Sequence, residues 1–212
     1  MDNTKTISIV ISSYKYGHLA GHCIESMLSQ TRKPDKIYLV DDGMGDCNHL
    51  LDIYPEVEYI LRETNLGTVD NFQDMLNRVD TDYVMFIGAD NWLRPDTLEL
   101  LEKNINDIVT YDIVVTGELK DSWTNRFGIG KEIDGGYKYW SRKGSHHGSM
   151  LYDVKKAKAV GGYCDGHSKN GGNTQEDQNL FKRLKQSGAN ITHIEEGLLF
   201  YRRHKENFNS CK

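Results

Sequence analysis

An apolar run from Tyr83 to Ile87 ends in small residues and then in Asp90, so a carboxylate follows directly on a predicted strand. In an open α/β sheet, ligands and metal ions collect in the crevice beyond the carboxyl ends of the strands. A turn or a helix cap is the other common role for such an aspartate, but Asp96 after Pro95 already marks the next helix start. We therefore predict Asp90 as a ligand of a divalent cation.

Polar residues also follow three other predicted strands. Ser12-Ser13-Tyr14 follows the first, Asp41-Asp42-Gly43 the second and Asn65-Leu66-Gly67 the third. Parallel strands end at the same edge of a sheet, so these segments and Asp90 are expected to line one crevice.

The elements that would position these residues alternate along the first half of the chain. Strands are predicted over 6–12, 36–41, 57–62, 83–87 and 112–116, and helices over 19–30, 50–54, 68–79 and 96–108. This alternation predicts an α/β fold with a mostly parallel central sheet flanked by helices.

Regular periodicity is lost after Gly117. The segment 123–148 is rich in glycine and aromatic residues and is predicted to be irregular, which is typical of a functional loop. A helix over 154–160, a glycine-rich loop over 161–172, a helix over 175–187 and short strands near Ile191 and Leu198 follow. We expect one domain over 1–212, whose character changes between 1–116 and 117–212.

The composition is that of an ordinary globular protein, with 38% hydrophobic and 27% charged residues among 212. A net charge of −5 argues against a surface that coats nucleic acid. Four scattered cysteines form no C-x-x-C pair, so neither a zinc knuckle nor a disulfide framework is indicated. No leader and no membrane-spanning stretch is evident, so a cytoplasmic protein is expected. Nothing in the sequence indicates an oligomeric state.

The order of these motifs closely resembles the family 2 glycosyltransferases, which transfer sugars from nucleotide-sugar donors on a GT-A fold. The resemblance runs over almost the whole chain and rests on Val10–Tyr14, Cys23–Thr31, Val40–Gly43, Asn65–Gly67, Gly88–Asn91, Gly161–Tyr163, Glu176-Asp177 and Tyr201–His204.

The resemblance implies a nucleotide-binding half over 1–116, with the donor site at its strand ends, and an acceptor-side half over 117–212. It places Asp90 on the metal-binding D-x-D motif, and His204 beside the same metal, Mn²⁺ or Mg²⁺, or the diphosphate. Arg202 and Arg203 would assist the diphosphate or be solvated charges.

The resemblance also makes Ser12, Tyr14, Asp42 and Asn65 contacts to the base and ribose. A UDP-sugar is the favoured donor, because a carboxylate such as Asp42 can accept the imide hydrogen of uracil. The sequence departs from the family at Gly88, which replaces the first acid of the D-x-D motif.

Transfer needs a base for the acceptor hydroxyl, and the resemblance assigns this role to Asp177 in the Glu176-Asp177 motif. The alternative is an acidic first helical turn that interacts with the helix dipole. A single displacement with such a base inverts the anomeric configuration.

A saccharide is the expected acceptor. The pair His146-His147 is interpreted as part of an acceptor-binding loop, since adjacent histidines rarely bind one metal ion. The basic and aromatic stretches 138–143 and 202–205 leave a modified nucleic-acid base as an alternative acceptor.

Other functions are compatible with a similar fold. Gly88 replaces an acid of the D-x-D motif, and this loss leaves a second possibility. The protein would then bind nucleotide sugars or carbohydrates on the same fold without catalysis. A nucleotidyltransferase or a dinucleotide-dependent oxidoreductase would need a glycine-rich phosphate loop after the first strand, where the chain has Ser13–Gly17.

Overall fold

The computed structural model describes residues 4–121, 130–141, 146–164 and 175–207. The strands are β1 (Ile7–Ser13), β2 (Lys36–Asp41), β3 (Glu58–Leu61), β4 (Tyr83–Gly88), β5 (Trp92–Leu93), β6 (Ile108–Thr116), β7 (Lys131–Ile133), β8 (Tyr137–Trp140), β9 (Met150–Asp153) and β10 (Ile191–Arg202). The α-helices are α1 (Gly17–Leu28), α2 (Thr68–Arg78), α3 (Thr97–Lys103), α5 (Val154–Ala159) and α6 (Glu176–Gln186). Short 3-10 turns are η1 (Asn48–Leu50), η2 (Asp134–Gly136) and η3 (His147–Ser149).

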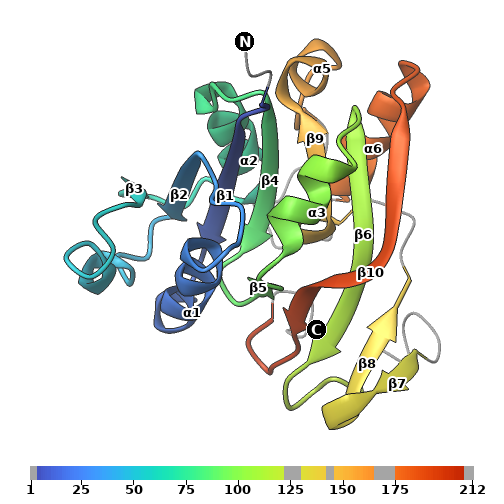
Figure 1. Ribbon diagram of the computed structural model, residues 1–212. Coiled ribbons are helices and arrows are strands. Elements are labelled where there is room, and N and C mark those ends of the chain that lie inside the picture. The colour runs from blue at the N-terminus through green and yellow to red at the C-terminus, as the bar shows by residue number, and fades with distance from the viewer. Residues whose placement is uncertain (1–3, 122–129, 142–145, 165–174, 208–212) are drawn as a thin grey trace.

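The described strands form one sheet in the order β3-β2-β1-β4-β9-β6-β10-β5, with the hairpin of β7 and β8 joined through β6. Helices α1 and α3 cover one face, and α2, α5 and α6 cover the other (Figure 1). The predicted α/β class, with a mostly parallel sheet flanked by helices, is confirmed. None of the described helices has the length and hydropathy that a membrane crossing requires.

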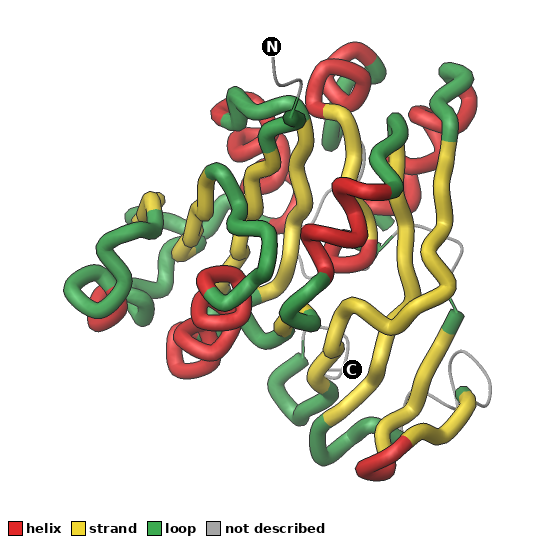
Figure 2. Tube along the Cα trace, viewed as in Figure 1, coloured by secondary structure: helices red, strands yellow, loops and turns green. Residues whose placement is uncertain are grey.

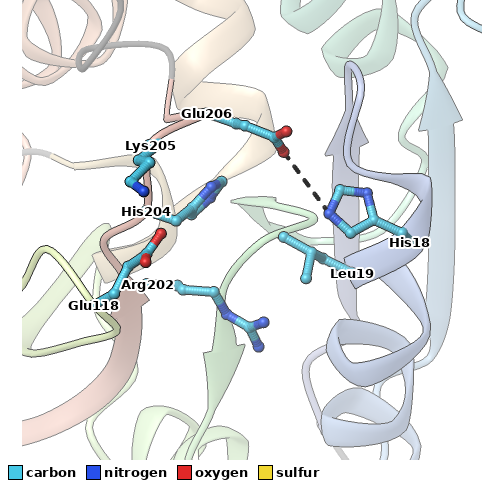
Figure 3. A pocket seen from close by; sticks show the side chains of 7 residues that line it. All are labelled: His18, Leu19, Glu118, Arg202, His204, Lys205 and Glu206. Carbon is cyan, nitrogen blue, oxygen red and sulfur yellow. Dashed lines mark ion pairs between the residues drawn. The ribbon is translucent and has the colours of Figure 1, made fainter.

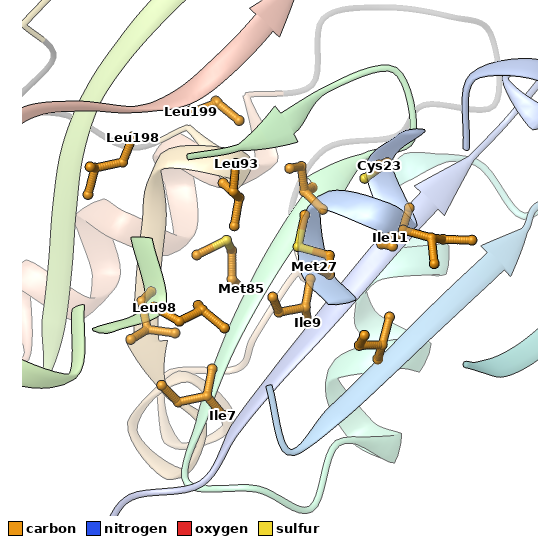
Figure 4. Close-up of a cluster of buried hydrophobic side chains, with 14 of the residues drawn as sticks. Ile7, Ile9, Ile11, Cys23, Met27, Met85, Leu93, Leu98, Leu198 and Leu199 are labelled. Carbon is orange, nitrogen blue, oxygen red and sulfur yellow. The ribbon is translucent and has the colours of Figure 1, made fainter. Parts of the chain in front are cut away.

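Strand β1 is buried on both faces. Ile7, Ile9 and Ile11 pack with α1 and α3 in the cluster drawn in Figure 4, whereas Val10 packs on the opposite side with α2 and β4. All four are fully buried. A strand covered from both sides has apolar residues on both faces, as in the run Ile9-Val10-Ile11. The buried hydroxyl of Ser8 accepts a hydrogen bond from Oγ1 of Thr81 at 2.7 Å.

Residues predicted to lie at strand ends are neighbours in the sheet. Ser13 pairs with Asp41 of β2, and Ser12 pairs with Gly88 of β4. Because β9 runs antiparallel to both β4 and β6, these two strands point the same way, and β10 is parallel to β6. The carboxyl ends of β1, β2, β4, β6 and β10 therefore share one edge of the sheet.

Strands β6 and β10 run side by side (Figure 2). Strand β6 begins at Ile108, earlier than the predicted 112–116, and β10 is one strand of 12 residues where two short strands were predicted. An irregularity in register between Ile194 and Gly197 interrupts the pattern of β10. A side chain at Gly197 would overlap Val114 of β6, so a glycine is needed for this close pairing.

Other boundaries also differ from the prediction. The helix predicted over 96–108 ends at Lys103, because the β-branched run that follows joins the sheet as β6. In place of the helix predicted over 50–54 there is only the turn η1. Of the predicted glycine-rich loop, residues 165–172 lie outside the described residues.

The segment 123–148, predicted to be irregular, contains β7, β8 and η3 within its described part. Strand β8 pairs with the carboxyl half of β6, for example Tyr139 with Val114, and β9 pairs with the amino half. This strand depends on a partner more than twenty residues away, so it has no local signature that sequence periodicity could detect.

Gly17 opens α1 against the loop after β2, and a methyl group there would overlap the carbonyl oxygen of Asp46. We expect Gly17→Ala to lower the free energy of unfolding by about 1–3 kcal/mol, as overpacking does. The control is Gly21→Ala in the same helix, where the nearest neighbour is the Tyr54 hydroxyl at 3.3 Å and alanine gains helix propensity. Urea unfolding measures both, and equal losses of stability would contradict this account.

Candidate active site

Asp90 lies just past β4, buried, in contact with residues from the other end of the chain. Its Oδ2 lies 3.1 Å from Nε2 of His204, and Nδ2 of Asn207 donates to the same oxygen at 2.8 Å. The two residues predicted to hold a metal, Asp90 and His204, are thus brought together although 114 positions separate them in the sequence.

Asn207 holds this C-terminal segment in place and was missed by the sequence analysis. Its Oδ1 accepts a hydrogen bond from the His204 amide at 2.7 Å, and its Nδ2 donates to the Arg202 carbonyl at 3.1 Å. The segment is also tied to β4, because Oδ1 of Asn91 accepts from the Arg202 amide at 3.0 Å. An asparagine three residues after a histidine is only a weak turn signal, so its role depends on the fold.

Gly88 fits this arrangement. A Cβ atom at position 88 would lie 2.7 Å from Oδ1 of Asp90 and 3.1 Å from Nδ2 of Asn91. Because Oδ2 of Asp90 is held by His204 and Asn207, the carboxylate cannot turn away without losing those contacts. The glycine at position 88, where the family has the first acid of the D-x-D motif, therefore leaves the space that the Asp90 carboxylate occupies.

A pocket of about 300 Å³ lies between α1 and the C-terminal segment. Figure 3 shows its lining residues, His18, Leu19, Glu118, Arg202, His204, Lys205 and Glu206. Glu206 reaches across to His18, with 3.8 Å between the carboxylate and Nε2. The pocket thus lies beside the pair of Asp90 and His204 and combines several basic side chains with two carboxylates.

The guanidinium of Arg202 has a defined position beside the pocket. Its Nη2 lies 2.9 Å from Nδ1 of His22, and the group lies over the ring of Trp92 at 5.0 Å. Trp92 in turn stacks on Phe200 with ring centroids 5.3 Å apart. A guanidinium held in this way suits an anionic group such as a phosphate better than a freely moving side chain would.

The predicted contacts at the end of β1 lie at the same edge. The hydroxyl of Ser12 accepts from Nδ2 of Asn71 at 3.1 Å. Tyr14 is 40% exposed, with the amino group of Lys15 5.1 Å from its ring centroid. An exposed aromatic ring is available for stacking, and the roles of Ser12 and Tyr14 toward a base and ribose remain predictions.

Asp42 joins the loops that follow β2 and β3. Its oxygens accept from the amides of Leu66 at 3.0 Å and Gly67 at 3.2 Å, and Nε of Arg62 lies 3.5 Å away. Burial raises the pKa of Asp42 above its ordinary value, although these partners act in the opposite direction. Asn65 is exposed in the loop that Asp42 holds. The contacts predicted for Asp42 and Asn65 toward a nucleotide remain predictions.

Asp41, Asp46 and Cys47 form a compact group within the described residues, with their ligand atoms all within 4.8 Å of one another. Asp41 accepts from the amides of Met44 at 2.8 Å and Cys47 at 3.1 Å, and Asp46 accepts from the Gly17 amide. Burial raises the pKa of the Cys47 thiol to about 12, so it is protonated at neutral pH and a poor metal ligand. We interpret this group as the support of the loop after β2.

The predicted base, Asp177, lies in the first turn of α6, next to Glu176. Oε1 of Glu176 lies 3.1 Å from Nε2 of His147, and both side chains are largely buried. Burial acts to raise the pKa of Glu176, but the hydrogen bond and charge of His147 outweigh it, so this pKa lies below its ordinary value. Asp177 is partly buried, and its Oδ1 accepts from the Gln178 amide at 2.7 Å.

The adjacent histidines have different partners. The ring of His146 packs edge-on against Tyr201 at 5.2 Å, whereas His147 is paired with Glu176. Gly148 follows, and a Cβ there would lie 3.4 Å from Ile87 at the end of β4. The turn η3, and with it the start of α6, therefore lies near the strand end that carries Asp90.

The donor atoms of Asp90 and His204 fit a divalent cation. Neighbouring ligand atoms around an octahedral ion with bonds of 2.0–2.1 Å are about 3 Å apart. The 3.1 Å between Oδ2 of Asp90 and Nε2 of His204 is compatible with that spacing. A carboxylate oxygen together with an imidazole nitrogen forms a mixed set that several divalent metals accept.

Comparisons with known proteins identify the family and the fold. The family model described as glycosyl transferase family 2 matches residues 8–161. Among solved structures, residues 1–349 of TarS from Staphylococcus aureus, in complex with UDP-GlcNAc, superpose with a TM-score of 0.72 at 15% identity, covering 98% of this chain and 61% of that one. A structure of the same fragment in complex with UDP gives a TM-score of 0.67, also at 15% identity, over 96% of this chain and 62% of that one.

Two curated relatives match the chain over about half its length. Glycosyltransferase GlyA of Streptococcus pneumoniae is 29% identical over 104 residues, which is 47% of this chain and 15% of that protein. An uncharacterized glycosyltransferase of Haemophilus influenzae is 27% identical over 119 residues, 54% of this chain and 46% of that protein. The matched regions thus span less than half of either relative.

The lowered pKa of Glu176 predicts a pH-dependent contribution to stability. A carboxyl group whose pKa is lower in the folded state stabilises the fold above its ordinary pKa of about 4.3, and this contribution is lost as the pH falls through the folded value. We expect Glu176→Gln to lower the free energy of unfolding by about 1 kcal/mol at pH 7 and by less at pH 3.5, where more of the carboxyl group is protonated. Chemical denaturation at both pH values, with exposed Glu56→Gln as control, measures this. An equal loss at both would contradict it.

Proposed function

The chain belongs to glycosyl transferase family 2, and we propose that it transfers a sugar from a nucleotide-sugar donor to an acceptor hydroxyl. The observation that carries this proposal is the 3.1 Å contact between Asp90 and His204 at the carboxyl edge of the sheet, beside a pocket with basic side chains. This arrangement suits a diphosphate accompanied by a cation better than it suits a neutral ligand.

A UDP-sugar is the proposed donor. Ser12, Tyr14, Asp42 and Asn65, which lie at or beyond the ends of β1, β2 and β3, would contact the base and ribose. The TarS structure with UDP-GlcNAc has a similar fold and makes this the first donor to test.

Asp90 and His204 would hold Mn²⁺ or Mg²⁺, with Asn207 keeping His204 in place. When bound, such an ion would offset the negative charge that develops on the leaving diphosphate. Arg202 and Lys205 would bind the phosphate oxygens from the pocket side.

Asp177 would act as the general base. The acceptor oxygen attacks the anomeric carbon, the bond from that carbon to the diphosphate oxygen breaks, and the proton of the acceptor hydroxyl passes to the Asp177 carboxylate. The nucleoside diphosphate leaves with the bonding electron pair. Attack from the face opposite to the leaving group inverts the anomeric configuration.

A saccharide is the proposed acceptor, bound by the half over 117–212. The alternative acceptor, a modified nucleic-acid base, is motivated by the basic and aromatic residues of β8 and of 202–205, although the net charge of −5 favours a saccharide. If the protein is instead a catalytically silent binder, it will bind the donor with metal but release no product.

Binding and turnover should respond differently to two aspartates. We expect Asp90→Ala to lower the affinity for UDP with Mn²⁺ by at least tenfold, because a metal ligand is lost. Asp177→Asn should bind normally and turn over about 10²–10⁴-fold more slowly, because only the proton acceptor is lost. Calorimetry and a nucleotide-sugar panel measure the two effects, with exposed Asp52→Ala as control. Undiminished affinity of Asp90→Ala would refute the metal assignment.

Restoring the family's first acid should be harmful in this chain. In Gly88→Asp the new side chain would displace the Asp90 carboxylate, since even a Cβ lies 2.7 Å from its Oδ1. We expect weaker binding of Mn²⁺ in the presence of UDP, and Gly88→Ala should show part of the same loss. Calorimetric titration of Mn²⁺ in the presence of UDP measures the affinity of each variant. Tighter Mn²⁺ binding by Gly88→Asp would contradict this prediction, because the new carboxylate would then act as an additional metal ligand.

A further inference from the structure

His147 connects several separate parts of the chain. Its Nε2 contacts Glu176 of α6 at 3.1 Å, and its Nδ1 lies 3.4 Å from the hydroxyl of Tyr163, which follows α5. Its ring packs edge-on against Phe72 of α2 with centroids 4.3 Å apart. The Tyr163 hydroxyl is in turn 2.7 Å from that of Tyr152 in β9. Both tyrosines are almost fully buried.

The hydrogen bonds of this group can run as a chain of donors and acceptors from Tyr152 to Glu176. A carboxylate can only accept, so the Nε2 hydrogen of His147 donates to Glu176 whether the ring is charged or neutral, and Nδ1 accepts when the ring is neutral. Burial raises the pKa of Tyr163 well above its ordinary value, so its hydroxyl keeps its proton and can donate to Nδ1. Tyr152 can then donate to Tyr163, which gives each member of the group a partner.

Among the residues that the structure describes, no side-chain cap fixes the N-terminus of α6. Gln175, the residue before the helix, has φ +51° in the left-handed region and makes no side-chain capping hydrogen bond. Such a conformation is uncommon outside glycine and persists only where the surroundings impose it. Within the described residues, the contact of Glu176 with His147 connects this first turn to η3 and so to the end of β4.

Within the described part of the chain, the orientation of Asp177 depends on its own helical turn. The hydrogen bond that its carboxylate accepts comes from the next residue in the same turn, Gln178. Its direction therefore follows the backbone of the first turn of α6, and the backbone is held through Glu176.

We propose that His147 is a positioning residue for sugar transfer, which holds the Glu176 carboxylate and thereby fixes the helical turn that presents Asp177 to the acceptor. This inference rests on the proposed function. A misplacement of about 1 Å at a reacting group can cost about 100-fold in rate. His147 would therefore affect the rate of transfer and leave donor binding unchanged.

The first experiment compares His147→Phe, which keeps a flat ring without nitrogen atoms, with His147→Gln, which keeps an N–H donor. UDP release from UDP-GlcNAc with Mn²⁺ gives kcat and KM, and exposed His49→Phe is the control. We expect kcat of His147→Phe to fall about 10–100-fold with KM changed less than twofold, and His147→Gln to recover most of the rate. A raised KM with unchanged kcat, or no recovery in His147→Gln, would overturn the proposal.

The second experiment needs no donor. Hydrogen exchange at the amide of Asn179, which donates to the Gln175 carbonyl at 2.8 Å, reports whether the first turn of α6 is closed. We expect at least tenfold faster exchange in His147→Phe and in Glu176→Ala, and no further increase in the double variant, because each substitution removes the same contact. Unchanged exchange, or additive effects, would overturn the proposal.

The two experiments separate failure of this inference from failure of the proposed function. If the wild-type protein releases no UDP from any nucleotide sugar, the proposed function fails, while the exchange data still decide whether His147 fixes the turn. If Asp177→Asn turns over normally but His147→Phe is slow and exchanges fast, His147 positions Glu176 as the base instead, and the assignment to Asp177 is wrong.

Discussion

Burial of β1 and β4 on both faces is the constraint on which the site depends. Their side chains pack alternately with α1 and α3 on one side and with α2, α5 and α6 on the other. A charged group cannot be accommodated inside such a layer without a partner, so polar chemistry begins only where the strands end. Ser12 beside Gly88, and Ser13 beside Asp41, show how the parallel register gathers these ends at one edge.

The carboxylates at that edge differ in what surrounds them. Asp41 and Asp42 accept hydrogen bonds from backbone amides of the loops after β2 and β3, so they determine the shape of those loops. Asp90 instead meets side chains of the C-terminal segment, His204 and Asn207. The aspartates at the ends of β2 and β4 therefore have different partners, because each carboxylate oxygen can accept only from the donors within hydrogen-bond distance.

Local patterns predicted much of this protein. The apolar runs of β1 and β4 and the amphipathic repeat of α1 and α2 are visible in the sequence because burial requires them. The ordered motifs around Asp90 and His204 predicted that the two would meet. The hairpin of β7 and β8 and the continuous β10 were not predicted, since their pairing with β6 involves residues far apart in the chain and leaves no periodic signal.

The sequence by itself determined the α/β class, the strand ends that carry polar residues and the family, because each follows from short-range patterns of burial and residue type. Only the tertiary structure decided that Asn207 supports the pair of Asp90 and His204, that Gly88 leaves room for the Asp90 carboxylate and that His147 pairs with Glu176. The contact of Asn207 with Asp90 joins residues 117 positions apart, and that of His147 with Glu176 joins residues 29 positions apart. The packing of the whole sheet and its helices brings these distant residues into contact, and no local sequence pattern specifies it.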